Sequence, residues 1–218
     1  IRTSKGDYWT KYAVIATGYY DHPNLLNIPG EDLPKVTHYF KEAHPFYNMD
    51  VAVIGGKNSS VDAALELAKV GARGTVLYRG SSYSDHIKPW VLPEFLSQVR
   101  SGAIRMVFNA HVKEITETEV IYLEGEELKR IPNDFVFAMT GYHPDHSFLQ
   151  KMGVNIDNET GRPIYNPETM ETNVEGIFIA GVLAAGNNAN EIFIENGRFH
   201  GDLIASAIQL KEKSLSKL

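Results

Sequence analysis

The amino-acid sequence predicts an α/β fold built on a parallel sheet, and three observations support this. A short apolar run over 51–54 leads into a Gly-Gly turn. An amphipathic helix follows, and a second β-rich run comes after it over 75–78. Three more apolar runs lead into glycines, at Gly18, Gly141 and Gly181. Strands that each end in glycine are typical of a ligand lying along the carboxyl edge of a parallel sheet.

Composition excludes several functional classes. The 218 residues suffice for one large domain or two small ones, and 43% hydrophobic with 22% charged residues is typical of a soluble globular protein. A net charge of -6 argues against nucleic-acid and anionic-membrane partners. The chain has no bilayer-length apolar run, no visible signal peptide and no cysteine, so we expect a cytoplasmic protein without a thiolate site. Because it begins at Ile1 without Met, we also expect an N-terminal part to be missing.

The elements can be predicted in chain order. The helix over 61–70 places Val61, Ala64, Leu65 and Ala68 on one face, with N-cap candidates Asn58, Ser59 and Ser60 and a C′ residue Gly71. A second helix over 93–100 should end at Gly102, a short one spans 147–152, and a final one spans 191–210 with Ile192, Phe199, Leu203 and Ala207 on one face. Buried strands are predicted over 12–16, 134–139 and 176–181, and short antiparallel strands over 104–108, 112–116 and 120–123, with Gly125 in a turn.

The first glycine turn has the chemistry of a phosphate site. Gly55 permits a tight turn, and the helix beyond it offers free N–H groups and a positive dipole end to a pyrophosphate. In the G-x-G-x-x-G fingerprint, Lys57 replaces the second glycine and Ser60 the third. Lys57 either crowds the phosphate or binds it through its ammonium group. A glycine-rich turn without any ligand is the alternative.

The end of the second strand indicates which dinucleotide binds. An acid there reads a free ribose 2′-hydroxyl, whereas an arginine suits a 2′-phosphate. This strand ends in Tyr78 and Arg79 without an acid, and Lys88 lies a few residues further on. The pattern therefore favours NADPH over NADH. The alternative is that Arg79 is an ordinary solvated charge on the surface and binds no ligand. The eight histidines show no metal-ligand spacing, so we assign neither a metal site nor a catalytic residue.

Three motifs in order resemble the thioredoxin-reductase-like two-dinucleotide flavoproteins: Ala16-Thr17-Gly18, Gly55-Gly56-Lys57-Asn58-Ser59-Ser60 and the segment over 176–181. The resemblance implies a parallel-sheet NADPH domain with an antiparallel β-meander, inserted in a truncated FAD domain. Residues 1–28 would be a remnant of the FAD domain, 29–140 the NADPH domain and 141–218 the C-terminal half of the FAD domain. The absent N-terminal part would hold the first glycine fingerprint.

Two departures narrow this resemblance. The segment over 38–46 has no sulfur where thioredoxin reductases have a redox Cys-x-x-Cys, and Val182 follows Gly181 where an acid is usual. Together with Tyr78-Arg79-Gly80, Ile87-Lys88-Pro89-Trp90, Gly141-Tyr142-His143-Pro144 and the run over 193–197, the chain is similar to the bacillithiol-disulfide reductase family. That implies an NADPH-dependent FAD enzyme that reduces a small-molecule disulfide, with hydride passing from NADPH to FAD.

The resemblance also implies roles for individual residues. Gly55, Gly56, Lys57, Asn58, Ser59 and Ser60 would face the NADPH pyrophosphate, and Arg79 with Lys88 the 2′-phosphate, although Gly80 and Ser84 replace two arginines of thioredoxin reductases. Thr17, Gly18 and Gly181 would lie near FAD, and Asn190, Glu191 and Ile192 would meet the flavin ring. Gly141 and Val182 are further cofactor-binding candidates.

Alternatives remain open at this point. One is a ferredoxin- or flavodoxin-NADP reductase, which also lacks the cysteine pair. Another is an NADPH-binding module without flavin or activity, and this is what we expect of these 218 residues taken alone. A third is a domain that binds no ligand. Homo-oligomerisation is left open.

Overall fold

The computed structural model describes residues 1–188 and 191–216, which form two compact units. The first unit comprises Ile1–Pro23 and Tyr142–Leu218, and the second comprises Asn24–Gly141. The chain therefore passes twice between the units. The assignment of segments 1–28, 29–140 and 141–218 to particular cofactor domains stays a prediction.

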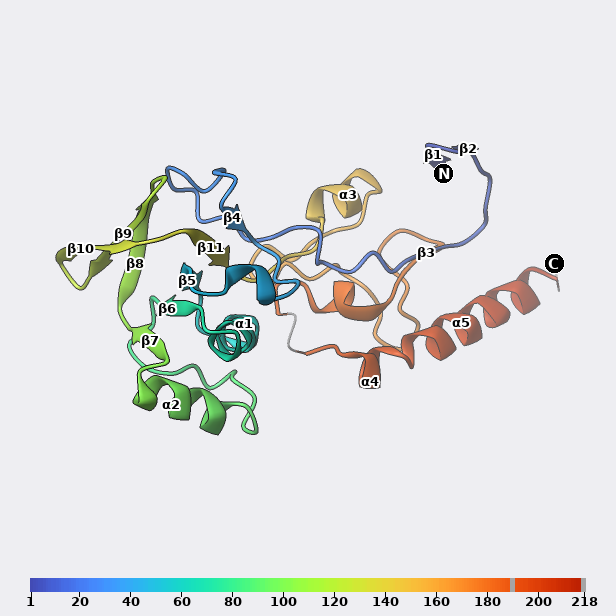
Figure 1. The fold of residues 1–218 in the computed structure, drawn as a ribbon. Helices are drawn as coiled ribbons and strands as arrows, with labels where there is room; N and C mark the ends of the chain where they lie inside the picture. The colour runs from blue at the N-terminus through green and yellow to red at the C-terminus, as the bar shows by residue number, and fades with distance from the viewer. Residues whose placement is uncertain (189–190, 217–218) are drawn as a thin grey trace. The chain divides into compact units, whose positions relative to one another are not determined.

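The second unit is organised around a five-stranded parallel sheet in the order β4-β11-β5-β6-β7 (Figure 1). Its strands are β4 (Val36–Thr37), β11 (Phe135–Ala138), β5 (Asp50–Ile54), β6 (Arg73–Leu77) and β7 (Ile104–Val107). At the centre, Val53 pairs with Phe137 on one side and with Val76 on the other. The predicted α/β fold class with a parallel sheet is confirmed.

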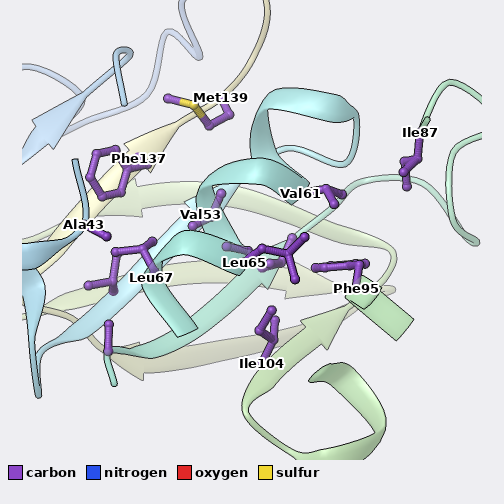
Figure 2. Close-up of a cluster of buried hydrophobic side chains, with 14 residues drawn as sticks. Ala43, Val53, Val61, Leu65, Leu67, Ile87, Phe95, Ile104, Phe137 and Met139 are labelled. Carbon is purple, nitrogen blue, oxygen red and sulfur yellow. The ribbon is translucent and has the colours of Figure 1, made fainter. Parts of the chain in front are cut away.

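Alternate residues of β5 face two different cores. Val51 and Val53 belong to one core with residues of helices α1 (Asn58–Lys69) and α2 (Leu92–Ser101), and Figure 2 shows Val53 beside α1. Ala52 and Ile54 face an antiparallel meander of β8 (Ala110–Ile115), β9 (Glu119–Glu124) and β10 (Glu127–Pro132). The sheet is thus covered on both faces, which explains why its central strand is apolar throughout.

Helix α1 follows the predicted periodicity. Val61, Ala64 and Leu65 are buried as expected, and Ala63 and Leu67 are buried as well, so the apolar face is wider than predicted. The predicted N-cap was wrong: the cap residue is Lys57, and the helix begins at Asn58 without a side-chain cap. The predicted C′ residue Gly71 is confirmed, with φ +82°.

One strand orientation was predicted wrongly. β7 was expected to be antiparallel, but it pairs in parallel with β6. The reason is the connection, because α2 lies between the two strands and such a crossover returns the chain in the same direction. The end of α2 at Gly102, with φ +80°, and the turn at Gly125, with φ +64°, were predicted correctly.

The first unit contains two small sheets of two strands each, and its longest helix lies near the C-terminus. Strands β3 (Ala13–Ile15) and β12 (Ile177–Ile179) pair in parallel, and β1 (Arg2–Thr3) pairs with β2 (Gly6–Asp7). Its helices are α3 (His146–Lys151), α4 (Ile194–Gly197) and α5 (His200–Leu215), and it also has a short 3-10 helix, η2 (Gly181–Ala185). A second 3-10 helix, η1 (His44–Phe46), belongs to the second unit. Within residues 1–188 and 191–216, no helix is both long and apolar enough to cross a membrane.

The final helix was predicted as one element, but it is two. The Asn196 side chain accepts a hydrogen bond from Phe193 N–H at 2.7 Å and starts α4, which ends at Gly197. The predicted apolar face is also wrong in part, because Phe199 and Leu203 are exposed. In α5 it is Ile204 and Ala207 that enter the core.

Candidate functional site

The turn between β5 and α1 requires glycine at position 55. Gly55 has φ +143°, and a Cβ there would lie 2.4 Å from the Met139 carbonyl oxygen. It would also lie 3.2 Å from Cβ of Ser60, which is buried at the start of α1. The turn is therefore pressed between the end of β11 and the first turn of the helix, and only small residues permit this approach.

The N-terminus of α1 opens at the carboxyl edge of the sheet. Ser60 Oγ donates to the Lys57 carbonyl at 2.7 Å, while the Lys57 and Ser59 side chains are exposed. The Asn58 side-chain oxygen accepts a hydrogen bond from Lys88 N–H at 2.8 Å. The structure thus brings Lys88, from a distant loop, to the helix end where N–H groups and the helix dipole favour an anion.

Three cations belong to this edge of the second unit. Lys57, Arg79 and Lys88 are exposed. In the part of the chain that the structure describes, no carboxylate forms an ion pair with any of them. Their charges are therefore not neutralised within the unit and are available to phosphate groups, for which arginine offers a bidentate donor geometry.

Sequence reasoning placed Tyr78 at the end of β6 but missed the contact of its ring with the glycine turn. A Cβ at Gly56 would lie 2.3 Å from the Tyr78 ring, and one at Gly80 would lie 2.5 Å from it. The ring therefore occupies the space that side chains at both positions would fill. The sequence shows only an aromatic residue two positions before a glycine at a strand end. This pattern predicts a contact with Gly56 only after β5 and β6 are known to be neighbours.

A cavity of about 450 Å³ lies at the other edge of this sheet. It is lined by residues at the amino ends of β5 and β6, by the end of α1, and by Gly102, Ala103 and Arg105. The cavity does not include the glycine turn. Of its two arginines, Arg73 is paired with Asp50 at 2.7 Å and lowers the pKa of Asp50 through this hydrogen bond, whereas Arg105 is exposed. The cavity lies beside the C-terminal end of α1, where the helix dipole disfavours an anion, so the glycine turn is the better phosphate site.

Two predicted turns of the first unit lie at one sheet edge. Thr17 and Gly18 follow β3, and Gly181 and Val182 follow β12, its parallel neighbour. Gly18 and Gly181 both have φ +70°, and a Cβ on either would meet nothing within 4 Å. The open space beside both turns is what a bound cofactor needs, so their predicted role near FAD stays a prediction that the geometry permits.

Gly181 N–H donates a hydrogen bond to His200 Nδ1 at 3.1 Å, and burial lowers the pKa of His200. In the unfolded chain this pKa is about 6.5, so below that pH the unfolded state takes up a proton that the folded state does not. The stability contribution is complete above about pH 6.5 and falls as the pH drops towards the folded pKa. Asparagine does not titrate, and its side-chain oxygen can accept the same hydrogen bond. When the pH is lowered from about 7.5 to about 5, we therefore expect the free energy of unfolding to fall less for His200→Asn than for the parent chain.

Thermal unfolding across this pH range measures the difference. His146, whose pKa is also lowered chiefly by burial, is present in both proteins, so its contribution cancels. Parallel stability curves for the two proteins would contradict the assignment.

The remaining predicted residues are placed as follows. Gly141, with φ +88°, accepts a hydrogen bond from Asn24 N–H at 2.9 Å in the second unit. The Glu191 carboxylate is held by Arg162 and Asn188, and Ile192 is half-buried against the first-unit core. Asn190 lies outside the described residues. The role of these residues at a flavin stays a prediction.

Comparisons with known proteins identify the family. Residues 1–181 match the family model for pyridine nucleotide-disulphide oxidoreductases. The chain is 71% identical over 213 residues to the bacilliredoxin reductase Bdr of Bacillus subtilis (strain 168), covering 97% of this chain and 66% of the relative. It is similar to the structure of the bacillithiol disulfide reductase Bdr (YpdA) from Bacillus cereus, with 70% identity, a TM-score of 0.90, and 92% and 62% of the two chains covered.

The corresponding protein from Staphylococcus aureus gives 58% identity and a TM-score of 0.89, again over 92% of this chain and 62% of the other. The chain thus spans slightly less than two thirds of the length of these relatives. The resemblance to bacillithiol-disulfide reductases and the predicted fold class are confirmed. The matched family implies FAD and a nicotinamide cofactor. With a glycine turn at the carboxyl edge of a parallel sheet and a family model that covers most of its length, this chain belongs to the pyridine nucleotide-disulphide oxidoreductase family.

Proposed function

We propose that this chain supplies the NADPH-binding unit and part of the FAD-binding unit of a flavoprotein that reduces a small-molecule thiol disulfide. The observation that carries the proposal is the likeness at 71% and 70% identity to two proteins, which are named a bacilliredoxin reductase and a bacillithiol disulfide reductase. The second name points to bacillithiol disulfide as the substrate. The unpaired cations beside the glycine turn add physical support for a phosphorylated dinucleotide.

The residues of the second unit fit a nicotinamide dinucleotide. Gly55 and Ser60 let the chain turn closely enough for the α1 N–H groups to bind the pyrophosphate, with Lys57 beside it. Arg79 and Lys88 take the 2′-phosphate. The bound NADPH and FAD supply the redox chemistry, and the protein supplies their placement. Thr17, Gly18, Gly181 and Val182 then provide the backbone edge for FAD in the first unit.

Arg79→Ala is expected to weaken NADPH binding by roughly tenfold to 100-fold, because it removes one or two charge-assisted hydrogen bonds to the 2′-phosphate. Binding of NADH, which lacks that phosphate, should hardly change. Calorimetric titration with both dinucleotides measures the difference, and Arg105→Ala serves as the control because Arg105 is exposed at the amino edge of the same sheet. An equal loss of affinity for both dinucleotides would show that Arg79 does not read the phosphate.

The electron acceptor is tested by following NADPH oxidation by the full-length flavoprotein to which this chain is proposed to contribute. Bacillithiol disulfide is supplied as one acceptor and ferredoxin as the other. Turnover with bacillithiol disulfide supports the proposal, whereas turnover with ferredoxin alone supports a ferredoxin-NADP reductase and contradicts it. If the purified chain binds NADPH but shows neither flavin absorbance nor turnover, these residues act as a nucleotide-binding module.

A further inference from the structure

A largely buried acid–histidine pair of the second unit has no role in the function proposed above. His38 Nε2 lies 3.3 Å from Glu31 Oε1, and only 13% and 12% of the two side chains are exposed. Long polar side chains are seldom buried to this degree unless they are paired, and a pair costs desolvation that must be recovered by good hydrogen bonds. The contacts of both side chains therefore indicate what the pair holds in place.

Both members of the pair are fixed by backbone groups. The Glu31 carboxylate accepts hydrogen bonds from Leu26 N–H at 2.6 Å and from Asn27 N–H at 2.7 Å. On the other side, His38 Nδ1 lies 3.1 Å from the Ala138 carbonyl oxygen. A backbone carbonyl can only accept, so Nδ1 donates this bond and the ring orientation is set. The pair therefore joins the loop before β4 to the end of β11.

The pair lies at the same sheet edge as the glycine turn. β4 ends at Thr37, immediately before His38, and β11 ends at Ala138. The next residue, Met139, is the one whose carbonyl oxygen would lie 2.4 Å from a Cβ at Gly55. A continuous line of contacts thus runs from the glycine turn through the end of β11 to His38 and Glu31.

The strand order indicates which half of a dinucleotide this edge meets. Successive crossovers run from β5 to β6 to β7 in one direction, and β11 and β4 lie on the other side of β5. A dinucleotide binds across such a switch point, with its two nucleotides on opposite sides. Tyr78 and Arg79 follow β6 and lie on the adenosine side, so the ends of β11 and β4 lie on the nicotinamide side.

We propose that Glu31 and His38 are positioning residues for the nicotinamide half of the cofactor. They fix the carboxyl ends of β4 and β11, over which that half lies, and they leave the adenosine half to Arg79 and the glycine turn. This inference rests on the proposed binding of NADPH by the second unit. It predicts that the pair matters only for ligands that carry a nicotinamide nucleotide.

The test compares NADP⁺ with 2′-phospho-ADP-ribose, which retains the adenosine half and lacks the nicotinamide. Calorimetric affinities are measured for the parent 218-residue chain and for His38→Gln, Glu31→Gln and the control His111→Gln, an exposed histidine on β8. For His38→Gln and Glu31→Gln we expect NADP⁺ to bind about tenfold more weakly, corresponding to about one hydrogen bond, with 2′-phospho-ADP-ribose changed by less than about twofold. The control should match the parent chain for both ligands.

Any other pattern of affinities contradicts either the positioning role of Glu31 and His38 or the proposed binding of NADPH. Equal losses for both ligands, or no loss for either, would contradict the positioning role while leaving the proposed function intact. Failure of the parent chain to bind either ligand would contradict the proposed function itself. If His38→Gln does not unfold cooperatively, the comparison is read from Glu31→Gln, which keeps the size of the native side chain and one of its two acceptor oxygens.

Discussion

Gly55→Ala is expected to weaken NADPH binding by roughly 100-fold and to lower the midpoint of thermal unfolding. At φ +143° an alanine is strained by about 1–3 kcal/mol, and its Cβ would collide with the Met139 carbonyl. The turn must then move away from β11 and carry the start of α1 with it. Losing two charge-assisted hydrogen bonds to the pyrophosphate, at about 1.5 kcal/mol each, corresponds to this drop in affinity.

Gly74→Ala is the matched control for this substitution. Gly74 lies in β6 of the same sheet, its φ is not positive, and a Cβ there would meet nothing within 4 Å. Calorimetric NADPH titrations and thermal unfolding are compared for both variants and the parent chain. If Gly55→Ala bound NADPH as tightly as Gly74→Ala does, the glycine turn would not be the pyrophosphate site.

Phe95→Ala is expected to reduce the free energy of unfolding by about 3–5 kcal/mol, which is typical of removing a fully buried phenylalanine. Phe95 is the buried residue of α2 and is 0% exposed (Figure 2). Its ring makes an edge contact with Tyr83 at 6.1 Å between centroids. Tyr83 belongs to the loop that carries Lys88, so NADPH affinity should fall as well.

Phe148→Ala provides the control, because Phe148 lies on helix α3 with 40% of its surface exposed. Denaturant unfolding of the three proteins measures the free-energy differences. The control should lose less than about 1 kcal/mol. A loss of that small size for Phe95→Ala would mean that α2 does not depend on this contact.

The β5–α1–β6 unit could be predicted because its signals are local. A continuous apolar run, helical periodicity and the positive φ that a tight turn asks of glycine act within a few residues of one another. The orientation of β7 could not be read in the same way, since a short apolar strand looks alike in either direction. Its pairing with β6 follows from the α2 crossover, which is a property of the chain path.

The division of the last helix shows a second limit. Periodicity over 191–210 describes which residues share a face only if the helix is continuous. The helix is broken after Gly197, so Ile192 does not share a continuous helix with the residues of α5. Within α5, Ile204 is buried and Leu203 is exposed.

In the candidate site, the glycine turn and Arg79 were predicted, whereas the contact of the Tyr78 ring and the Glu31–His38 pair were not. The contact of Tyr78 with Gly56 exists only because β5 and β6 are neighbours. His38 and Ala138 are 100 positions apart in the sequence and meet through the pairing of β4 with β11. Long-range pairing of this kind leaves no local pattern for sequence reasoning to detect.

A crystal structure of the chain with bound NADP⁺ tests the central claim most directly. The account predicts the pyrophosphate at the N-terminus of α1 beside Gly55, and the 2′-phosphate in contact with Arg79. The nicotinamide should lie on the side of β11 and β4. A dinucleotide bound in the cavity at the amino edge of the sheet, or one whose 2′-phosphate does not contact Arg79, would contradict the account.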